Sequence, residues 1–271
     1  MVLFNWQFFA AVCIADGGSN AADNHILPET ELFPPILADQ REYVFSIQYE
    51  YRDQEDHDFK AAEVSFGDSL PIKNFELSPD STLQLTFDGV IYSLYDLDTE
   101  SYDLVNSDYL VGFSSAYRRG DFSTRLRIRH QSSHVGDEYL LHNSDTVREN
   151  TSFEEAQIMP AFEWQGWRVY AGGGAIFHSK NHIEPWNLQG GLEYLVPTSY
   201  SEVSLFLAAD YQGEARTDWT LNQSYRTGVL FGQRDERNIR LALEFVDGYA
   251  QDGQFAGNDS RYFGLAVFFQ L

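Results

Sequence analysis

Polar and apolar residues alternate with a period of two along this chain, from Tyr43 to its last residue. Strands have this period, because successive side chains of a strand point to opposite faces. No apolar run approaches the ~20 residues that a membrane-spanning helix needs. In the first segment the apolar and polar sets are Tyr43, Phe45, Ile47, Tyr49 and Tyr51 against Ser46, Gln48, Glu50 and Arg52. The chain is therefore predicted to form strands whose two faces meet different surroundings.

About twelve segments carry the pattern. The connections between them alternate between short turns and longer polar loops, as in bacterial outer-membrane barrels, which have an even number of strands. Residues 71–81, which begin at Pro71, are expected to be irregular and to interrupt this regularity. The predicted strands are 43–52, 61–70, 82–95, 105–117, 122–134, 154–164, 167–178, 185–195, 201–212, 219–231, 238–249 and 261–271.

The pattern predicts an all-β fold, a closed antiparallel transmembrane β-barrel of about 12 strands in a bacterial outer membrane. A secreted β-sandwich with inward apolar faces is the alternative, and it explains the alternation equally well. Only the barrel explains aromatic belts at both strand ends. One belt is expected at the periplasmic ends, from Tyr43, Tyr117, Phe122, Trp164, Trp167, Tyr194 and Phe231. The other is expected at the external ends, from Tyr51, Tyr95, Tyr109, Phe177, Trp186, Tyr211 and Trp219.

The first 42 residues differ from the rest. Residues 1–22 are predicted to be a secretory leader, with a short apolar stretch and a small-x-small cleavage site at Ser19-Asn20-Ala21. Cys13, the only cysteine, falls within it. Residues 23–42 hold three prolines and are predicted to be an irregular periplasmic segment. Residues 43–271 then form the barrel.

Charge and the last strand indicate partners. The net charge of -23 argues against nucleic acid as a partner, because its phosphates would be repelled. Membrane lipid is the expected partner of the apolar face. The alternation of Phe263, Leu265, Val267, Phe269 and Leu271 up to the end resembles the C-terminal signal read by the barrel-assembly machinery. A monomer and a homodimer both stay open.

Charged residues occupy many predicted inward positions. Mixed charges can pair across a narrow barrel and fill it. Arg125, Arg127 and Arg129 could instead line a path for anions through a weakly conducting barrel. The other inward charges are Glu50, Glu163, Arg168, Glu193, Asp210, Arg226, Arg240 and Glu244.

A candidate catalytic pair follows the arginines. Leu126 and Ile128 are expected to face lipid, so alternation points His130 and Ser132 outward too, near the external end of the strand. Two such residues lie roughly 6–7 Å apart along a strand. A neutral imidazole could then take the hydroxyl proton while serine attacks a carbonyl. By the same alternation, His178 is expected to face the lumen.

His130-Gln131-Ser132 resembles the H-Q-S motif of the outer membrane phospholipase A family, and lipid A deacylase barrels have a similar His-x-Ser arrangement. The resemblance implies that His130 is the general base and Ser132 the nucleophile of a lipid acyl-ester hydrolase. The sequence departs from the phospholipase pattern at Ser133-His134, where Asn-Gly is expected. More closely, His130 to Tyr139 and Leu32 to Asp39 resemble an uncharacterised family of bacterial outer-membrane barrels.

Two residues are candidates for orienting His130. In a simple hairpin Glu154 is expected opposite Ser132 and near His130, whereas Asn143 is the alternative because the phospholipase uses Asn. Asp137 and Glu138 are candidate calcium ligands near an oxyanion site, or else solvated loop acids. The leading hypothesis is hydrolysis of phospholipid or lipid A, and the alternative is a non-enzymatic structural or weakly conducting barrel.

Overall fold

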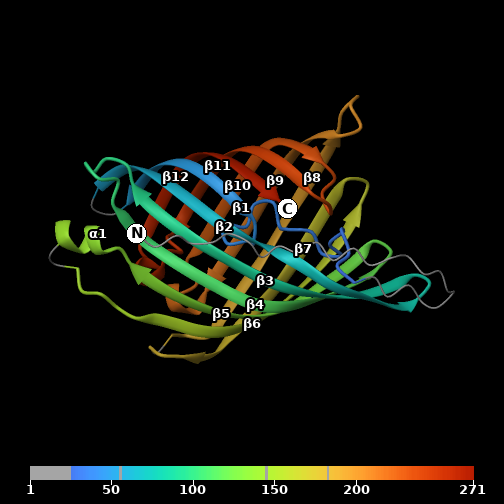
Figure 1. Ribbon diagram of the computed structural model, residues 1–271, viewed down its shortest axis with the longest axis horizontal. Coiled ribbons are helices and arrows are strands. Elements are labelled where there is room, and N and C mark those ends of the chain that lie inside the picture. The colour runs from blue at the N-terminus through green and yellow to red at the C-terminus, as the bar shows by residue number, and fades with distance from the viewer. Residues whose placement is uncertain (1–25, 55–56, 144–145, 182) are drawn as a thin grey trace, which may run out of the picture.

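The chain forms a closed barrel of twelve antiparallel strands, as the alternation predicts (Figure 1). The computed structural model describes residues 26–54, 57–143, 146–181 and 183–271. The predicted leader lies outside these residues and stays a prediction. The strands are β1 Phe45–Gln54, β2 His57–Ser78, β3 Ser81–Asp96, β4 Leu104–Arg119, β5 Phe122–Val135, β6 Thr151–Trp164, β7 Trp167–Ser179, β8 Trp186–Pro197, β9 Val203–Glu214, β10 Leu221–Gly232, β11 Asn238–Tyr249 and β12 Asp259–Gln270.

Each strand pairs with its neighbours in sequence, and the first strand pairs with the last. Phe45 lies opposite Phe269, and Gln54 lies opposite Ser260, so β1 and β12 close the ring along the whole length of β1. One α-helix, α1 Asp137–His142, lies in the long connection after β5 (Figure 1). Two short 3-10 helices, Ala215–Thr217 and Gly253–Phe255, lie in connections at the same end.

The expectation for residues 71–81 is wrong. Strand β2 continues through Pro71 to Ser78, and the ladder with β3 absorbs the proline by a register shift between Pro71 and Lys73. Proline is tolerated there because β1 pairs with β2 only as far as Ser65, which leaves this part of β2 at an edge. The β2–β3 turn is therefore short, like the other turns at its end. The first connection at the other end is also shorter than expected, because β1 and β2 extend to Gln54 and His57.

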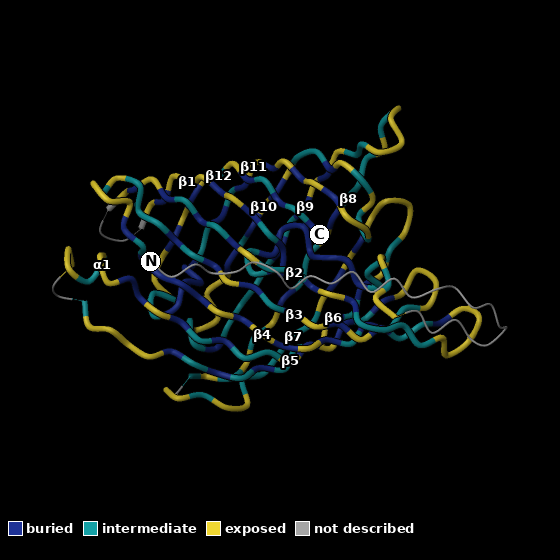
Figure 2. Tube along the Cα trace, viewed as in Figure 1, coloured by how far each residue is buried: buried dark blue, intermediate teal, exposed yellow. Residues whose placement is uncertain are grey.

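The two faces of the wall differ as the alternation requires (Figure 2). On β1 the outward Ile47 is 51% exposed, whereas the inward Glu50 is 0% exposed. On β5 Leu126 and Ile128 are 46% and 51% exposed, and Arg125 and Arg127 are buried. A β-sandwich would bury the apolar set, so this arrangement excludes it.

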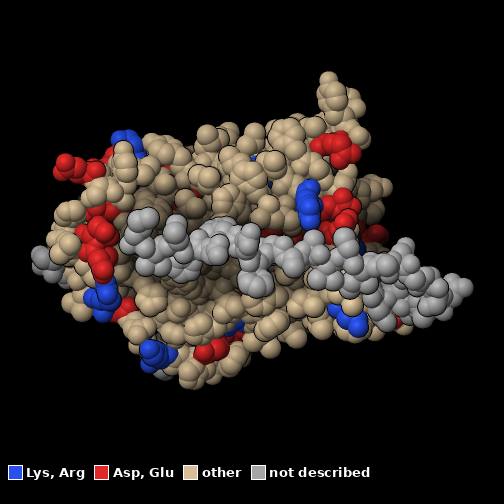
Figure 3. Space-filling model, viewed as in Figure 1, with Lys and Arg blue, Asp and Glu red and all other residues tan. Residues whose placement is uncertain are grey.

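Charged side chains gather toward the two ends of the barrel on the face seen in Figure 3, and few lie between them. The exposed side chains in the middle of the strands include the apolar Ile128 and Leu243. An apolar band between charged ends is the surface of a transmembrane barrel. Among the described residues, no helix is long and apolar enough to cross a membrane.

Most of the predicted belt aromatics point outward. Trp164, Phe177 and Trp186 are among the most exposed. Tyr43 is the exception, because it is fully buried and lies under the guanidinium of Arg127, 4.2 Å from its ring centre. It precedes β1 and belongs to the interior of the barrel.

The segment before β1 fills the lumen. Residues 26–44 are irregular, so the irregular part extends two residues past the segment 23–42 that was expected from the sequence, and from Phe33 to Ala38 they are buried inside the barrel. Leu37, Ala38 and Val44 pack on inward residues of β9–β12, including Phe206 and Phe268. On the opposite wall, Phe33 and Ile36 pack on Ala116, Met159, Ala161 and Tyr170. We call residues 26–44 the plug.

Candidate functional site

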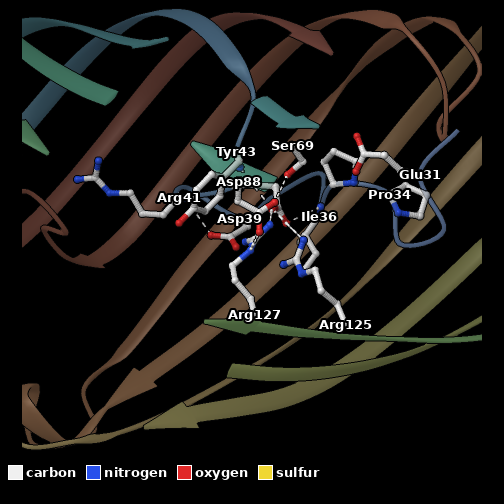
Figure 4. A network of polar contacts seen from close by, with 12 residues as sticks. Glu31, Pro34, Ile36, Asp39, Arg41, Tyr43, Ser69, Asp88, Arg125 and Arg127 are labelled. Atoms are coloured by element: carbon white, nitrogen blue, oxygen red, sulfur yellow. Dashed lines mark hydrogen bonds and ion pairs between the residues drawn. The ribbon is translucent and has the colours of Figure 1, made fainter. Parts of the chain in front are cut away.

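A buried carboxylate fixes the plug to β5. Arg125 Nη1 and Arg127 Nη2 each donate a hydrogen bond of 2.9 Å to Glu42 Oε1, and the backbone N–H of Ile36 donates to Oε2 at 3.1 Å. Figure 4 shows both arginines reaching from the wall toward the plug. Asp88 lies 3.4 Å from Nε of Arg127, so two carboxylates of the chain balance the charges of these two arginines, which do not line an open anion path.

Other inward charges bind the backbone of the plug. Arg168 donates to the carbonyl of Pro34 at 2.9 Å, and Arg226 donates to the carbonyl of Asp39 at 2.9 Å. Glu193 accepts the N–H of Leu37 at 2.6 Å. These contacts use polar groups that an irregular buried segment would otherwise leave unpaired. Several of the inward charges predicted from the sequence therefore hold the plug.

A small polar cavity remains at the end of the lumen where the long loops lie. It has a volume of about 50 Å³ and is lined by Arg129, Gln131, Glu155 and Gln212, among others. This volume holds a few water molecules. The lumen is therefore packed rather than open at this end.

On the outer wall, His130 and Ser132 of β5 point away from the lumen, while Gln131 and Ser133 are buried inside it. This is the orientation that the alternation predicts. Both outward residues lie in the second half of β5, toward the long connection that contains α1.

Glu154 of β6 contacts His130. The two residues are direct partners in the β5–β6 ladder, and Nδ1 of His130 lies 2.9 Å from Oε1 of Glu154. Ser132 lies opposite Ser152, so the expectation that Glu154 faces Ser132 is wrong by one pair, although Glu154 does reach His130. With Nδ1 held by a carboxylate, the proton is kept on that nitrogen and Nε2 is free to accept another.

His178 of β7 is the residue that sequence reasoning missed. Its Nδ1 lies 2.5 Å from the second carboxylate oxygen of Glu154, and its side chain is exposed on the outer wall. Alternation from the buried Arg168 and Tyr170 pointed it into the lumen. A β-bulge changes this, because the register shifts by one residue between Glu154 and Glu155. No composition or spacing signal marked this bulge.

Ser132 lies near His130 and Glu154 through its place on the strand, and not through a hydrogen bond to His130. It is the next outward residue after His130 on the same strand, with Tyr109 of β4 and Ser152 of β6 on either side. In the part of the chain that the structure describes, no hydrogen bond joins His130 to Ser132.

The other predicted site residues lie in the loop that follows β5. Asn143 ends α1, and its side chain donates to the carbonyl of Tyr139 at 3.0 Å, so it is engaged locally rather than with His130. Asp137 pairs with Arg148, and Glu138 is exposed in the first turn of the helix. The described residues contain no group of three or more His, Cys, Asp or Glu side chains that could hold a metal ion.

Solved structures similar to this chain are outer-membrane barrels. A dimer of the outer membrane phospholipase from Salmonella typhi with bound calcium has 15% sequence identity and a TM-score of 0.53, over 84% of this chain and 90% of that one. Outer membrane phospholipase A from Escherichia coli has 14% identity and a TM-score of 0.52, over the same shares. At these identities the likeness shows the fold alone: an outer-membrane barrel fold.

Sequence comparison identifies the family. No curated protein sequence matches the chain. One family model, described as "Protein of unknown function (DUF1207)", matches residues 7–271. This match spans nearly the whole chain, from before the plug to the end of β12. The chain therefore belongs to the DUF1207 family.

Proposed function

We propose that this protein lies in the bacterial outer membrane and hydrolyses acyl esters of membrane lipids, with Ser132 as nucleophile and His130 as general base. The observation that carries the proposal is the 2.9 Å contact between Nδ1 of His130 and Glu154, beside an outward serine. A carboxylate on one imidazole nitrogen directs the other nitrogen toward a proton to be removed, as in serine hydrolases. Glu154 takes the orienting role, and Asn143 is no longer needed for it.

The reaction follows from these roles. Ser132 Oγ turns toward Nε2 of His130, loses its proton to that nitrogen and attacks the ester carbonyl. Glu154 stabilises the resulting imidazolium. The tetrahedral intermediate collapses, the alcohol leaves with the proton from Nε2, and an acyl-serine forms. Water, deprotonated by His130, then releases the fatty acid and restores the serine.

The place of the site favours a lipid substrate. His130 and Ser132 face outward, just beyond the apolar Leu126 and Ile128 of the same strand. An amphiphile in the outer leaflet has its ester groups at this boundary and its acyl chains along the apolar band. Phospholipid and lipid A share this chemistry, and the similarity to a phospholipase barrel supports the same class.

Release of fatty acid by the purified protein tests the proposal. Vesicles of phospholipid and of lipid A serve as substrates, with and without Ca²⁺, since the Salmonella typhi phospholipase structure contains calcium. Ser132→Ala is expected to lower the rate on the order of 10³-fold. Ser152→Ala, which changes the outward serine directly opposite, is the matched control and is expected to keep the rate.

A fluorophosphonate probe gives a second test, because it labels only an activated serine. Labelling of the wild type and of Ser152→Ala, but not of Ser132→Ala, is expected. Equal hydrolysis by the wild type and Ser132→Ala, or absence of both hydrolysis and labelling with Ca²⁺ present, would overturn the proposal and leave a non-enzymatic barrel.

A further inference from the structure

We infer that His178 is a positioning residue of the same site: it holds Glu154, and Glu154 in turn holds His130. The inference rests on the proposed function and adds a fourth member to it. Three neighbouring strands supply the chain of contacts, with His130 on β5, Glu154 on β6 and His178 on β7.

Both oxygens of the Glu154 carboxylate are occupied. Oε1 is 2.9 Å from Nδ1 of His130, and Oε2 is 2.5 Å from Nδ1 of His178. A glutamate on an outward wall has a long side chain with several rotamers. A contact on each oxygen from opposite sides selects one of them and sets the plane of the carboxylate. His130 therefore receives a carboxylate that is already oriented.

The bulge in β7 is the local structure that makes this contact. Glu154 pairs with His178 and Glu155 with Ile176, so Phe177 is the extra residue of the bulge, and both Phe177 and His178 are exposed. A regular strand would turn one of them into the lumen. Bulges commonly re-aim side chains beside functional sites. From Glu155 and Ile176 onward the pairing of β6 with β7 is regular again. The side chain of Glu155 lies on the lumen side and forms an ion pair with Arg129 at 2.6 Å.

The two histidines are the ion-pair partners of Glu154, and the nearby Arg129 does not pair with it. Arg129 lies between Ile128 and His130 in sequence, but it points inward and is taken by Glu155. On the outer face the ladder places Ser132 and Ser152, which are uncharged, next to His130 and Glu154. The two imidazoles are thus the groups that share the Glu154 carboxylate.

Kinetics of three variants test this role. His178→Phe removes the donor and keeps an aromatic side chain on the outer face. It is expected to lower kcat by about tenfold, the lower end of what loss of an orienting partner costs, with KM unchanged. His178→Asn places an amide N–H close to the position of Nδ1 and is expected to restore most of kcat. His134→Phe, at another outward histidine that does not contact Glu154, is the matched control. An unchanged kcat in His178→Phe would overturn the inference.

A spectroscopic readout separates this inference from the proposed function. With ¹⁵N-labelled histidine in detergent micelles, His130 of the wild type is expected to carry its neutral-state proton on Nδ1. In His178→Phe a mixture of Nδ1–H and Nε2–H forms is expected, and His178→Asn is expected to behave as the wild type. A His130 signal that is unaffected in His178→Phe would exclude the positioning role, even if Ser132 proves to be catalytic. If His178→Phe changes the His130 signal but hydrolysis does not depend on Ser132, the contacts from His178 through Glu154 to His130 are supported and the proposed hydrolase function is rejected.

Discussion

Glu42 joins the plug to the barrel wall through two arginines. All three side chains are buried, so both ion pairs are shielded from water. Breaking such a pair from one side leaves a buried charge without compensation. Alternation predicted that Arg125 and Arg127 face the lumen, but Glu42 lies before the first strand, where no periodicity exists. Its partners therefore could not be predicted from the sequence.

Glu42→Gln is expected to lower the free energy of unfolding by about 3–5 kcal/mol, because Arg125 would lose its carboxylate partner and Arg127 would keep only Asp88, 3.4 Å from its Nε. Denaturant unfolding in detergent micelles measures this. Glu29→Gln, at an exposed position of the same plug, is the matched control and is expected to change the value by less than about 0.5 kcal/mol. Equal effects of the two variants would mean that Glu42 does not hold the plug.

Helix α1 is the one α-helix among the described residues, and it is attached to the barrel by side chains. The ring of His142 bonds the carboxylate of Asp103, and Tyr139 packs edge-on against Phe255 at 5.4 Å between ring centres. The bond from His142 lowers the pKa of Asp103 below its usual value. The sequence predicted a polar loop here but no helix, because six residues carry too little periodicity to be recognised. Strand bounds were predicted within a few residues, except in β2, where Pro71 suggested a break. In β7 the predicted bounds were right to within a residue, but the bulge at Phe177 reversed the expected direction of His178.

The attachment of α1 is expected to weaken in acid. Because the folded-state pKa of Asp103 is depressed, its contribution is fully present above about pH 3.9, the unfolded value, and is lost as pH falls through the lower folded value. Hydrogen-exchange protection of the α1 amides, corrected for intrinsic rates, is expected to fall below pH 4. Asp103→Asn is expected to lower this protection at neutral pH and to abolish its decrease in acid. Protection that is the same in both proteins at every pH would contradict the role of Asp103.

The average composition of the whole chain does not reveal the apolar outer face of the barrel. Mean hydropathy is -0.36, because only alternate residues face outward and the others are polar residues that meet the plug. The closed twelve-strand barrel was predicted from this alternation and from the loops. The filled lumen was predicted only as paired charge, since prolines and an irregular pattern do not say where a segment lies. The binding of the assembly machinery to β12 and the oligomeric state stay predictions.

Leu243→Arg tests the membrane surface of the whole barrel. Leu243 lies in the middle of β11 and is 61% exposed. In a water-soluble protein an exposed arginine is nearly neutral, but at the midplane of a bilayer it costs about 2–4 kcal/mol. Urea unfolding in phospholipid vesicles is expected to give this loss. Leu141→Arg in α1, where leucine is 81% exposed, is the control and is expected to cost less than about 0.5 kcal/mol. The same small effect at both positions would contradict a membrane-facing wall.

The plug has a consequence for the order of assembly. Val44 is buried with the plug and the next residue, Phe45, already pairs with Phe269 of the last strand. The last residue of the plug and the first residue of the strand that closes the ring are therefore joined by a single peptide bond. We expect the plug to be in place before or during the pairing of β1 with β12, because the two are consecutive in the chain. A barrel that closed without the plug would then have to admit it afterwards to become native.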